Sequence, residues 1–209
     1  MKLADFGLAR RMADPMSTKG MTHQVITRFY RPPELFYGCR YYGGKVDVWS
    51  MGCVFAELAI RDFFLPSETD IGQINRIHEV FGTPTEESWP GVSKLDLYSK
   101  LVAESPDSVS KGQPAHFWRQ RFGILGEDGI ELLRGMLAMD PRKRLSAKGV
   151  LEHRYWGMAP RPTEKSNLPT NCGDTMKAVG EDLKRRGGEV ESGRADKVAR
   201  KLDFGAMRK

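Results

Sequence analysis

The hydrophobic positions of this chain are densest between Val46 and Arg61. This segment, VDVWSMGCVFAELAIR, places apolar side chains on nearly every side of a helical wheel. A helix that is apolar on all sides is usually buried on all sides. The pattern therefore predicts a central helix over 46–61 that needs packing partners in every direction.

A second, amphipathic helix is predicted over 70–81. Its apolar residues recur at spacings of three and four: Ile71, Ile74, Ile77 and Phe81. The Gly-Thr-Pro sequence at 82–84 provides the residues that commonly end a helix. Two more helices are predicted over 128–139 and 147–153. Pro32-Pro33 marks a turn or a helix start, because proline suits the first helical turn.

The remaining segments lack this periodicity. Residues 1–4 are consistent with a short strand, and residues 8–27 with a long polar surface loop. Residues 83–126 contain scattered proline and tryptophan and no clear helical pattern. A segment of that length without regular structure is usually a functional insertion, which is our expectation here.

The charge is uneven along the 209 residues. The formal net charge is +6, and residues 157–209 contribute +4 of it, with twelve Lys and Arg against eight Asp and Glu. This last segment is rich in glycine and too poor in apolar residues to form a core. We therefore expect a mostly disordered basic tail over 157–209 and no direct nucleic-acid partner.

The cysteines Cys39, Cys53 and Cys172 are odd in number and form no CxxC pair. This distribution argues against a disulfide framework and against a zinc site. The first residues lack the apolar run of a signal peptide, and no run approaches the roughly 18 apolar residues of a membrane span. We expect a nuclear or cytoplasmic protein without a membrane partner.

Asp5-Phe6-Gly7 is followed, in order, by four further short motifs. They are Thr27-Arg28-Phe29-Tyr30-Arg31-Pro32-Pro33-Glu34, Asp47-Val48-Trp49-Ser50-Met51-Gly52-Cys53, Phe81-Gly82-Thr83-Pro84-Thr85 and Asp140-Pro141-Arg142-Lys143-Arg144-Leu145. Together these motifs resemble the cyclin-dependent protein kinases. A second Asp-Phe-Gly at 203–205 has no such motifs after it.

The resemblance implies a mainly α fold: the C-terminal lobe of a protein kinase over 1–156, without the β-rich N-terminal lobe, followed by the tail 157–209. Thr22-His23-Gln24-Val25 most resembles the kinase that activates other cyclin-dependent kinases and serves a transcription factor. No Gly-rich phosphate loop, strand lysine or His-Arg-Asp catalytic loop occurs in the sequence. We therefore assign no catalytic residue.

The same resemblance implies roles for residues near the N-terminus. Asp5 would hold Mg²⁺, and the alternative is a turn residue, which the downstream motifs make the weaker interpretation. Thr22 would be the activating phosphosite, with Ser17 or Thr18 as alternatives and Arg10 or Arg28 as an arginine for its phosphate.

A substrate pocket that favours proline after the phosphoacceptor would be formed by Val25, Ile26 and Arg31. For Val25 and Ile26 a role as buried loop anchors is the alternative. Thr27 would contact the catalytic aspartate of a complete kinase. Glu34 and Arg144 should form an ion pair between this segment and the lower lobe. Asp47 would cap backbone donors of a catalytic loop.

These residues lead to three hypotheses for function. The first is the lower lobe of a proline-directed Ser/Thr kinase, inactive alone, whose complete form uses Mg²⁺ and ATP, a cyclin, an assembly factor and Ser/Thr-Pro substrates. The second is a non-catalytic module that binds substrates or partners and competes with the complete kinase. The third is a chain without function of its own, in which Met1 is an internal methionine. The tail sequence Arg200-Lys201-Leu202-Asp203-Phe204 also fits a cyclin-docking pattern.

Overall fold

A computed structural model describes residues 6–9, 20–22, 25–103, 110–161 and 163–168. The expected strand at 1–4, Asp5, the arginine and hydroxyl candidates Arg10, Ser17 and Thr18, and all but the start of the expected tail lie outside these residues. The chain divides into a unit over Met1–Arg161 and a second over Pro162–Lys209. The described part of the second unit contains one short 3-10 turn, Lys165–Asn167.

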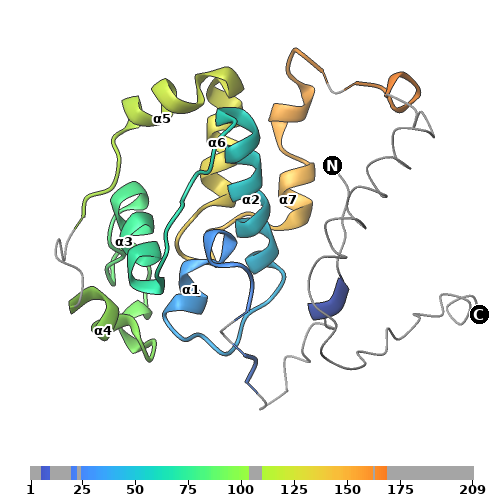
Figure 1. Cartoon of the computed structure of the whole chain (residues 1–209). Helices are drawn as coiled ribbons and strands as arrows, with labels where there is room; N and C mark the ends of the chain where they lie inside the picture. The colour runs from blue at the N-terminus through green and yellow to red at the C-terminus, as the bar shows by residue number, and fades with distance from the viewer. Residues whose placement is uncertain (1–5, 10–19, 23–24, 104–109, 162, 169–209) are drawn as a thin grey trace, which may run out of the picture. The chain divides into compact units, whose positions relative to one another are not determined.

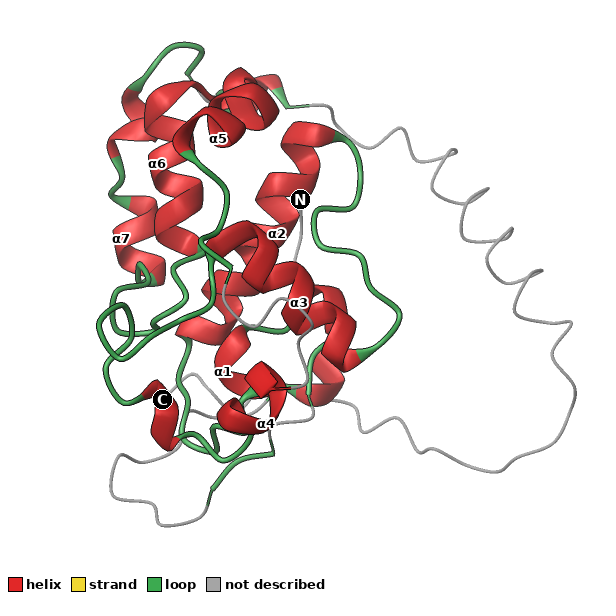
Figure 2. Cartoon of the chain, turned by 90° about the vertical axis from the view of Figure 1, so that its left-hand side faces the viewer, coloured by secondary structure: helices red, strands yellow, loops and turns green. Residues whose placement is uncertain are grey.

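Helices and loops build the first unit, and its described residues contain no strand (Figure 2). Its α-helices are α1 Pro33–Phe36, α2 Lys45–Ile60, α3 Asp70–Phe81, α4 Tyr98–Ala103, α5 Ala115–Phe122, α6 Gly126–Met136 and α7 Ala147–Leu151. Its 3-10 turns are Phe6–Leu8, Arg28–Tyr30, Val92–Lys94, Gly123–Leu125 and Arg154–Gly157. The predictions of helices near 46–61, 70–81, 128–139 and 147–153 are therefore confirmed.

Helix α2 lies at the centre, as its pattern predicts. It packs against α5, α6 and the Arg28–Tyr30 turn, and α6 lies beside it in Figure 1. The approach of α2 to the loop after α6 is close at Gly52, where an added Cβ would lie 2.8 Å from Leu137 Cδ2. A larger residue at position 52 would force the two segments apart.

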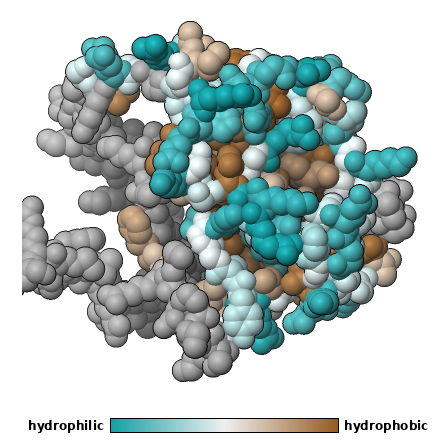
Figure 3. All heavy atoms as spheres, turned by 180° about the vertical axis from the view of Figure 1, so that it is seen from behind, coloured by the Kyte–Doolittle hydropathy of each residue, from teal (hydrophilic) through white to brown (hydrophobic). Residues whose placement is uncertain are grey.

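Burial of α2 is nevertheless incomplete. Trp49 is fully buried, whereas the side chain of Leu58 is 61% exposed and Val54 and Phe55 are half-buried. Phe81 closes over Trp49, with their ring centroids 5.4 Å apart. On the face shown in Figure 3, apolar surface is visible between the polar side chains. The described residues therefore cover only part of the side of this helix that carries Val54 and Leu58.

The expectation that 83–126 lacks regular structure is wrong. Helices α4 and α5 and two 3-10 turns form there, although residues 104–109 lie outside the description. Helix α5 has only eight residues and no side-chain cap, so its sequence signal is weak. It is stabilised by burial of Trp118 and Phe122, whose rings stack with centroids 5.6 Å apart.

A buried polar pair joins α1 to α3. Tyr37 Oη and His78 Nε2 share a hydrogen bond of 2.6 Å, and both side chains are almost fully buried. Within the described residues, the Nδ1 atom of His78 has no hydrogen-bond partner. Burial lowers the pKa of His78 to about 4, because a charged imidazole would be poorly solvated here.

This pair predicts acid sensitivity. The unfolded chain binds a proton at His78 near the ordinary pKa of 6.5, whereas the folded chain resists protonation until about pH 4. The free energy of unfolding should therefore fall as the pH drops from about 6.5 towards 4, by up to roughly 1.4 kcal/mol per pH unit. Urea unfolding at pH 7.5 and 5.0 measures this slope, and His78→Gln should flatten it. His116 is exposed on α5, so His116→Gln should leave the slope unchanged. An equal slope in the His78 variant would contradict this account.

Candidate substrate-binding site

The segment 25–34 is held against the central helix α2 by hydrogen bonds at two points along it. Ser50 Oγ donates to the carbonyl of Tyr30 at 2.8 Å, and Tyr30 Oη donates to Glu57 Oε2 at 3.1 Å. Glu57 also accepts from the backbone N–H of Phe64 at 3.3 Å. Pro33 follows as the first residue of α1, in the position where a missing N–H costs nothing. These contacts fix the backbone on which the expected substrate residues lie.

Arg31 brings the two expected pocket residues together through their backbone. Its Nε donates to the carbonyl of Val25 at 2.9 Å, and its Nη2 donates to the carbonyl of Ile26 at 3.2 Å. The guanidinium also lies 5.0 Å from the ring centre of Phe36. Arg31 therefore occupies two carbonyls that an incoming peptide could otherwise use as acceptors.

Ile26 adopts an unusual backbone conformation at this point. Its φ is 69°, in the left-handed region that a β-branched residue rarely enters. Such a conformation costs roughly 1–3 kcal/mol and persists only where the surroundings impose it. Here the Arg31 guanidinium donates a hydrogen bond to the carbonyl of Ile26 in this conformation. A strained residue held in place beside an ordered arginine is typical of a functional site.

Asp70 is the residue that sequence reasoning missed. It lies in the first turn of α3, and its Oδ1 accepts from Arg28 Nε at 2.8 Å while its Oδ2 lies 3.5 Å from Arg31 Nη1. Arg28 Nη1 also donates to the carbonyl of Glu68 at 2.6 Å. Arg28 was considered as a partner for phosphorylated Thr22, but in this structure it binds the start of α3 instead. The available signal was Thr69, which caps α3. A threonine in that position marks the start of a helix and so places Asp70 in the first turn, where a carboxylate complements the helix dipole.

The expected ion pair between Glu34 and Arg144 is present and bidentate. Arg144 Nη1 and Nη2 donate to the two carboxylate oxygens at 2.7 and 2.8 Å, and both residues are buried. The guanidinium also donates to the backbone carbonyls of Ala138 and Lys45, and it lies 5.1 Å from the ring centre of Trp49. Every face of this buried cation is therefore compensated, as buried charge requires.

Three other expected residues are exposed. Thr22 lies at the surface, and its carbonyl accepts from Tyr42 Oη at 2.6 Å. Thr27 is exposed beside the pocket residues. Asp47 is exposed in the first turn of α2, and no described residue donates a hydrogen bond to its side chain.

The described residues contain no group of three His, Cys, Asp or Glu that could hold a metal ion. They also contain no helix long and apolar enough to cross a membrane. The expected Mg²⁺ ligand, Asp5, is not among them.

Comparison with known proteins decides the family. The family model described as "Protein kinase domain" matches residues 1–156. The chain belongs to the protein kinase family. "Serine/threonine-protein kinase crk1" of Schizosaccharomyces pombe is 43% identical over 187 residues, which are 89% of this chain and 53% of that protein. "Cyclin-dependent kinase 7" of Xenopus laevis is 40% identical over 211 residues, which are 98% of this chain and 56% of that protein.

Solved structures agree with this assignment. The CAK complex from Chaetomium thermophilum bound to ATP-gamma-S contains a chain with 50% identity and a TM-score of 0.73, covering 81% of this chain and 51% of that one. The yeast RNA Pol II CTD kinase CTDK-1 complex contains one with 30% identity and a TM-score of 0.69, covering 77% and 51%. By sequence the chain belongs with the cyclin-dependent protein kinases, and its helical fold is that of the C-terminal lobe. It spans about half the length of the relatives it matches.

Proposed function

We propose that this chain is the substrate-binding lower lobe of a proline-directed Ser/Thr kinase of the CDK-activating type. The observation that carries the proposal is Arg31, which binds the carbonyls of Val25 and Ile26 while Ile26 has a φ of 69°. A substrate residue beside this segment finds those two backbone acceptors already occupied. Proline has no N–H to satisfy, so it loses nothing there, whereas any other residue leaves a donor unpaired.

The remaining residues support this site in distinct ways. Thr27 would face the catalytic aspartate of a complete domain, and Asp47 would cap its loop. Glu34 and Arg144 hold the segment to the lobe. Thr22 is exposed, as a residue that is phosphorylated by another enzyme must be. Its phosphate would add nearly two negative charges to the loop.

Magnesium ATP supplies the phosphoryl group in this family, and the resemblance assigns Asp5 to the ion. Positioning of nucleotide, metal and substrate provides most of the catalysis in phosphoryl transfer. The printed sequence contains neither a phosphate-binding loop nor a catalytic-loop aspartate. We propose that the chain alone transfers no phosphate and that activity requires those parts, a cyclin and an assembly factor. The nucleus and the cytoplasm are the proposed locations.

A second candidate is a non-catalytic module that binds the substrates of the complete kinase. It is favoured by the fact that every described contact around Arg31 and Asp70 is made within residues 25–70. This surface therefore needs no part of the nucleotide-binding lobe in order to form. Binding of a Ser-Pro peptide by the isolated chain without turnover would support this alternative.

The proposal can be tested with a chimera that places the N-terminal half of the fission-yeast crk1 kinase before residue 1, supplied with a cyclin. The chimera should phosphorylate a Ser-Pro peptide in preference to its Ser-Ala counterpart, and the isolated chain should phosphorylate neither. Arg31→Ala should reduce the preference about tenfold, since an unpaired buried donor costs roughly 1–3 kcal/mol. Arg119→Ala, which removes an exposed arginine on α5, serves as the control. Equal rates on the two peptides would contradict the proline pocket. Magnesium-dependent transfer by the isolated chain that is lost in Asp5→Ala would contradict its inactivity.

A further inference from the structure

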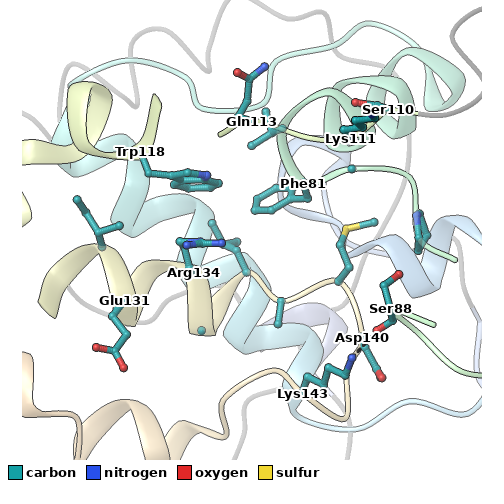
Figure 4. A pocket seen from close by; sticks show the side chains of 18 of the residues that line it. Phe81, Ser88, Ser110, Lys111, Gln113, Trp118, Glu131, Arg134, Asp140 and Lys143 are labelled. Atoms are coloured by element: carbon teal, nitrogen blue, oxygen red, sulfur yellow. Dashed lines mark hydrogen bonds between the residues drawn. The ribbon is translucent and has the colours of Figure 1, made fainter. Parts of the chain in front are cut away.

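A second pocket lies away from the segment 25–34, between the end of α3, helix α5 and the end of α6. Its volume is about 960 Å³, at the upper end of the range for ligand sites. Phe81, Trp118 and Arg134 lie close together in Figure 4 and come from these three helices. The pocket is therefore assembled from elements that are distant in sequence.

Aromatic side chains form one side of this pocket. The ring centroids of Phe81 and Trp118 are 5.6 Å apart, and the guanidinium of Arg134 lies 5.7 Å from the Trp118 ring centre. Trp118 is almost fully buried, whereas Phe81 is half-buried and Arg134 is exposed. An apolar side chain could contact Phe81 while a neighbouring anion approaches Arg134.

The acidic side chains of the pocket are already neutralised. Glu127 pairs with Arg119 at 2.8 Å, and Asp140 pairs with Arg142 at 2.9 Å. Glu131 pairs with Arg154. These three carboxylates therefore contribute little net negative charge to the space that they line.

The basic side chains differ. Lys111, Arg134 and Lys143 line the pocket, and none has a carboxylate partner among the described residues. Lys143 Nζ donates only to the backbone carbonyl of Ser88, at 2.6 Å. Arg134 suits the last turn of α6, where a cation complements the helix dipole. Lys111 and Lys143 lie in loops, so a helix dipole does not account for their charges. Lys143 lies close enough to Asp140 to help lower the pKa of that carboxyl, which Arg142 already binds. The pocket thus combines an excess of positive charge, chiefly from Lys111 and Arg134, with a half-buried aromatic surface.

We propose that this pocket binds an acidic peptide segment of a protein partner, one that carries a large apolar side chain between its carboxylates. The acidic residues would pair with Lys111, Arg134 and Lys143, and the apolar side chain would contact Phe81. A pocket of this volume accommodates a few residues of such a segment. The inference does not rest on kinase activity, because it concerns neither nucleotide nor the segment 25–34.

Fluorescence anisotropy tests the inference with the 209-residue chain and a fluorescein-labelled octapeptide, Glu-Asp-Glu-Phe-Asp-Glu-Phe-Asp. The chain should bind this peptide more tightly than versions with Gln and Asn for the acids or Ala for Phe. The double substitution Lys111→Gln and Arg134→Gln should weaken binding about tenfold. Both side chains are exposed, so circular dichroism should show an unchanged fold.

The matched control is the double substitution Arg76→Gln and Lys94→Gln. It removes the same charge from exposed positions that do not line the pocket, and should leave the affinity within about twofold of the starting chain. An equal loss in both double variants would reduce the effect to net charge and overturn the site. Equal binding of the Ala peptide would overturn the apolar contact. Tighter binding of a labelled single-stranded RNA with the same Arg134 dependence would assign the pocket to nucleic acid instead.

Discussion

Replacing Arg144 with alanine should lower the free energy of unfolding of this chain by about 3–5 kcal/mol. The substitution leaves Glu34, which is only 2% exposed, as an unpaired buried charge. Breaking a buried pair in this way typically costs about 3–5 kcal/mol, against a total stability of about 5–15 kcal/mol for a domain. The backbone carbonyls of Lys45 and Ala138 would also lose their donor. The midpoint of urea unfolding, followed by circular dichroism, measures the effect.

Two further variants separate charge from geometry. Arg144→Lys retains the charge but not the two parallel hydrogen bonds, so its stability should lie between the two extremes. The double variant Glu34→Leu and Arg144→Met removes both charges and should recover much of the lost stability. Arg119→Ala breaks an exposed pair with Glu127 and should cost less than about 1 kcal/mol. An Arg144→Ala variant as stable as the Arg119→Ala variant would show that the buried pair contributes nothing to the fold.

The helices that were predicted correctly are those whose periodicity is local. Helix α3 begins at Asp70 and ends at Phe81, as predicted, because Thr69 caps it and Gly82, with φ 89°, ends it. Helix α5 was missed because its stability comes from tertiary contacts: Trp118 and Phe122 pack against Phe64, which is 54 and 58 positions away in the sequence. The spacing of apolar residues within a short stretch of sequence does not reveal a contact between such distant positions.

The residues of the candidate site were named from a sequence motif, and the structure adds the contacts between them. Sequence reasoning named Val25, Ile26 and Arg31, but not the backbone conformation that joins them. A β-branched residue such as Ile26 is the type least expected at positive φ. The residue type at position 26 would therefore have predicted an extended backbone and not the left-handed conformation observed. Arg28 was one of two arginines named for a phosphate on Thr22, because charge alone does not reveal a partner on another helix. Asp70 competes for it from 42 positions away.

The uncovered side of α2 should make this chain associate with itself or bind a hydrophobic dye. The resemblance implies that part of 46–61 is uncovered around Trp49, Val54, Phe55 and Leu58, because a complete kinase packs this helix with a long helix and a catalytic loop. In the structure Trp49 is fully buried and the Phe55 ring packs against two aromatic rings of the 154–157 turn, so the expectation is wrong for these two residues. The exposure lies at the end of the helix and just beyond it, where Leu58 on α2 and Phe63 in the following loop are 61% and 55% exposed. With Val54 they line a hollow of about 390 Å³. Three charged side chains line the rest of this hollow, and an exposed apolar patch bordered by polar residues favours association.

The double substitution Leu58→Glu and Phe63→Ser should therefore reduce dye fluorescence by about half or more and shift the chain towards monomer in sedimentation. Its unfolding midpoint should change little, because neither side chain is buried in the core. Ile124 is 81% exposed at another site, so Ile124→Glu is a matched control that should leave association unchanged. If the starting chain is monomeric and binds no dye, its apolar side does not drive association. If the two variants behave alike, association arises from exposed apolar residues in general and not from this side of α2.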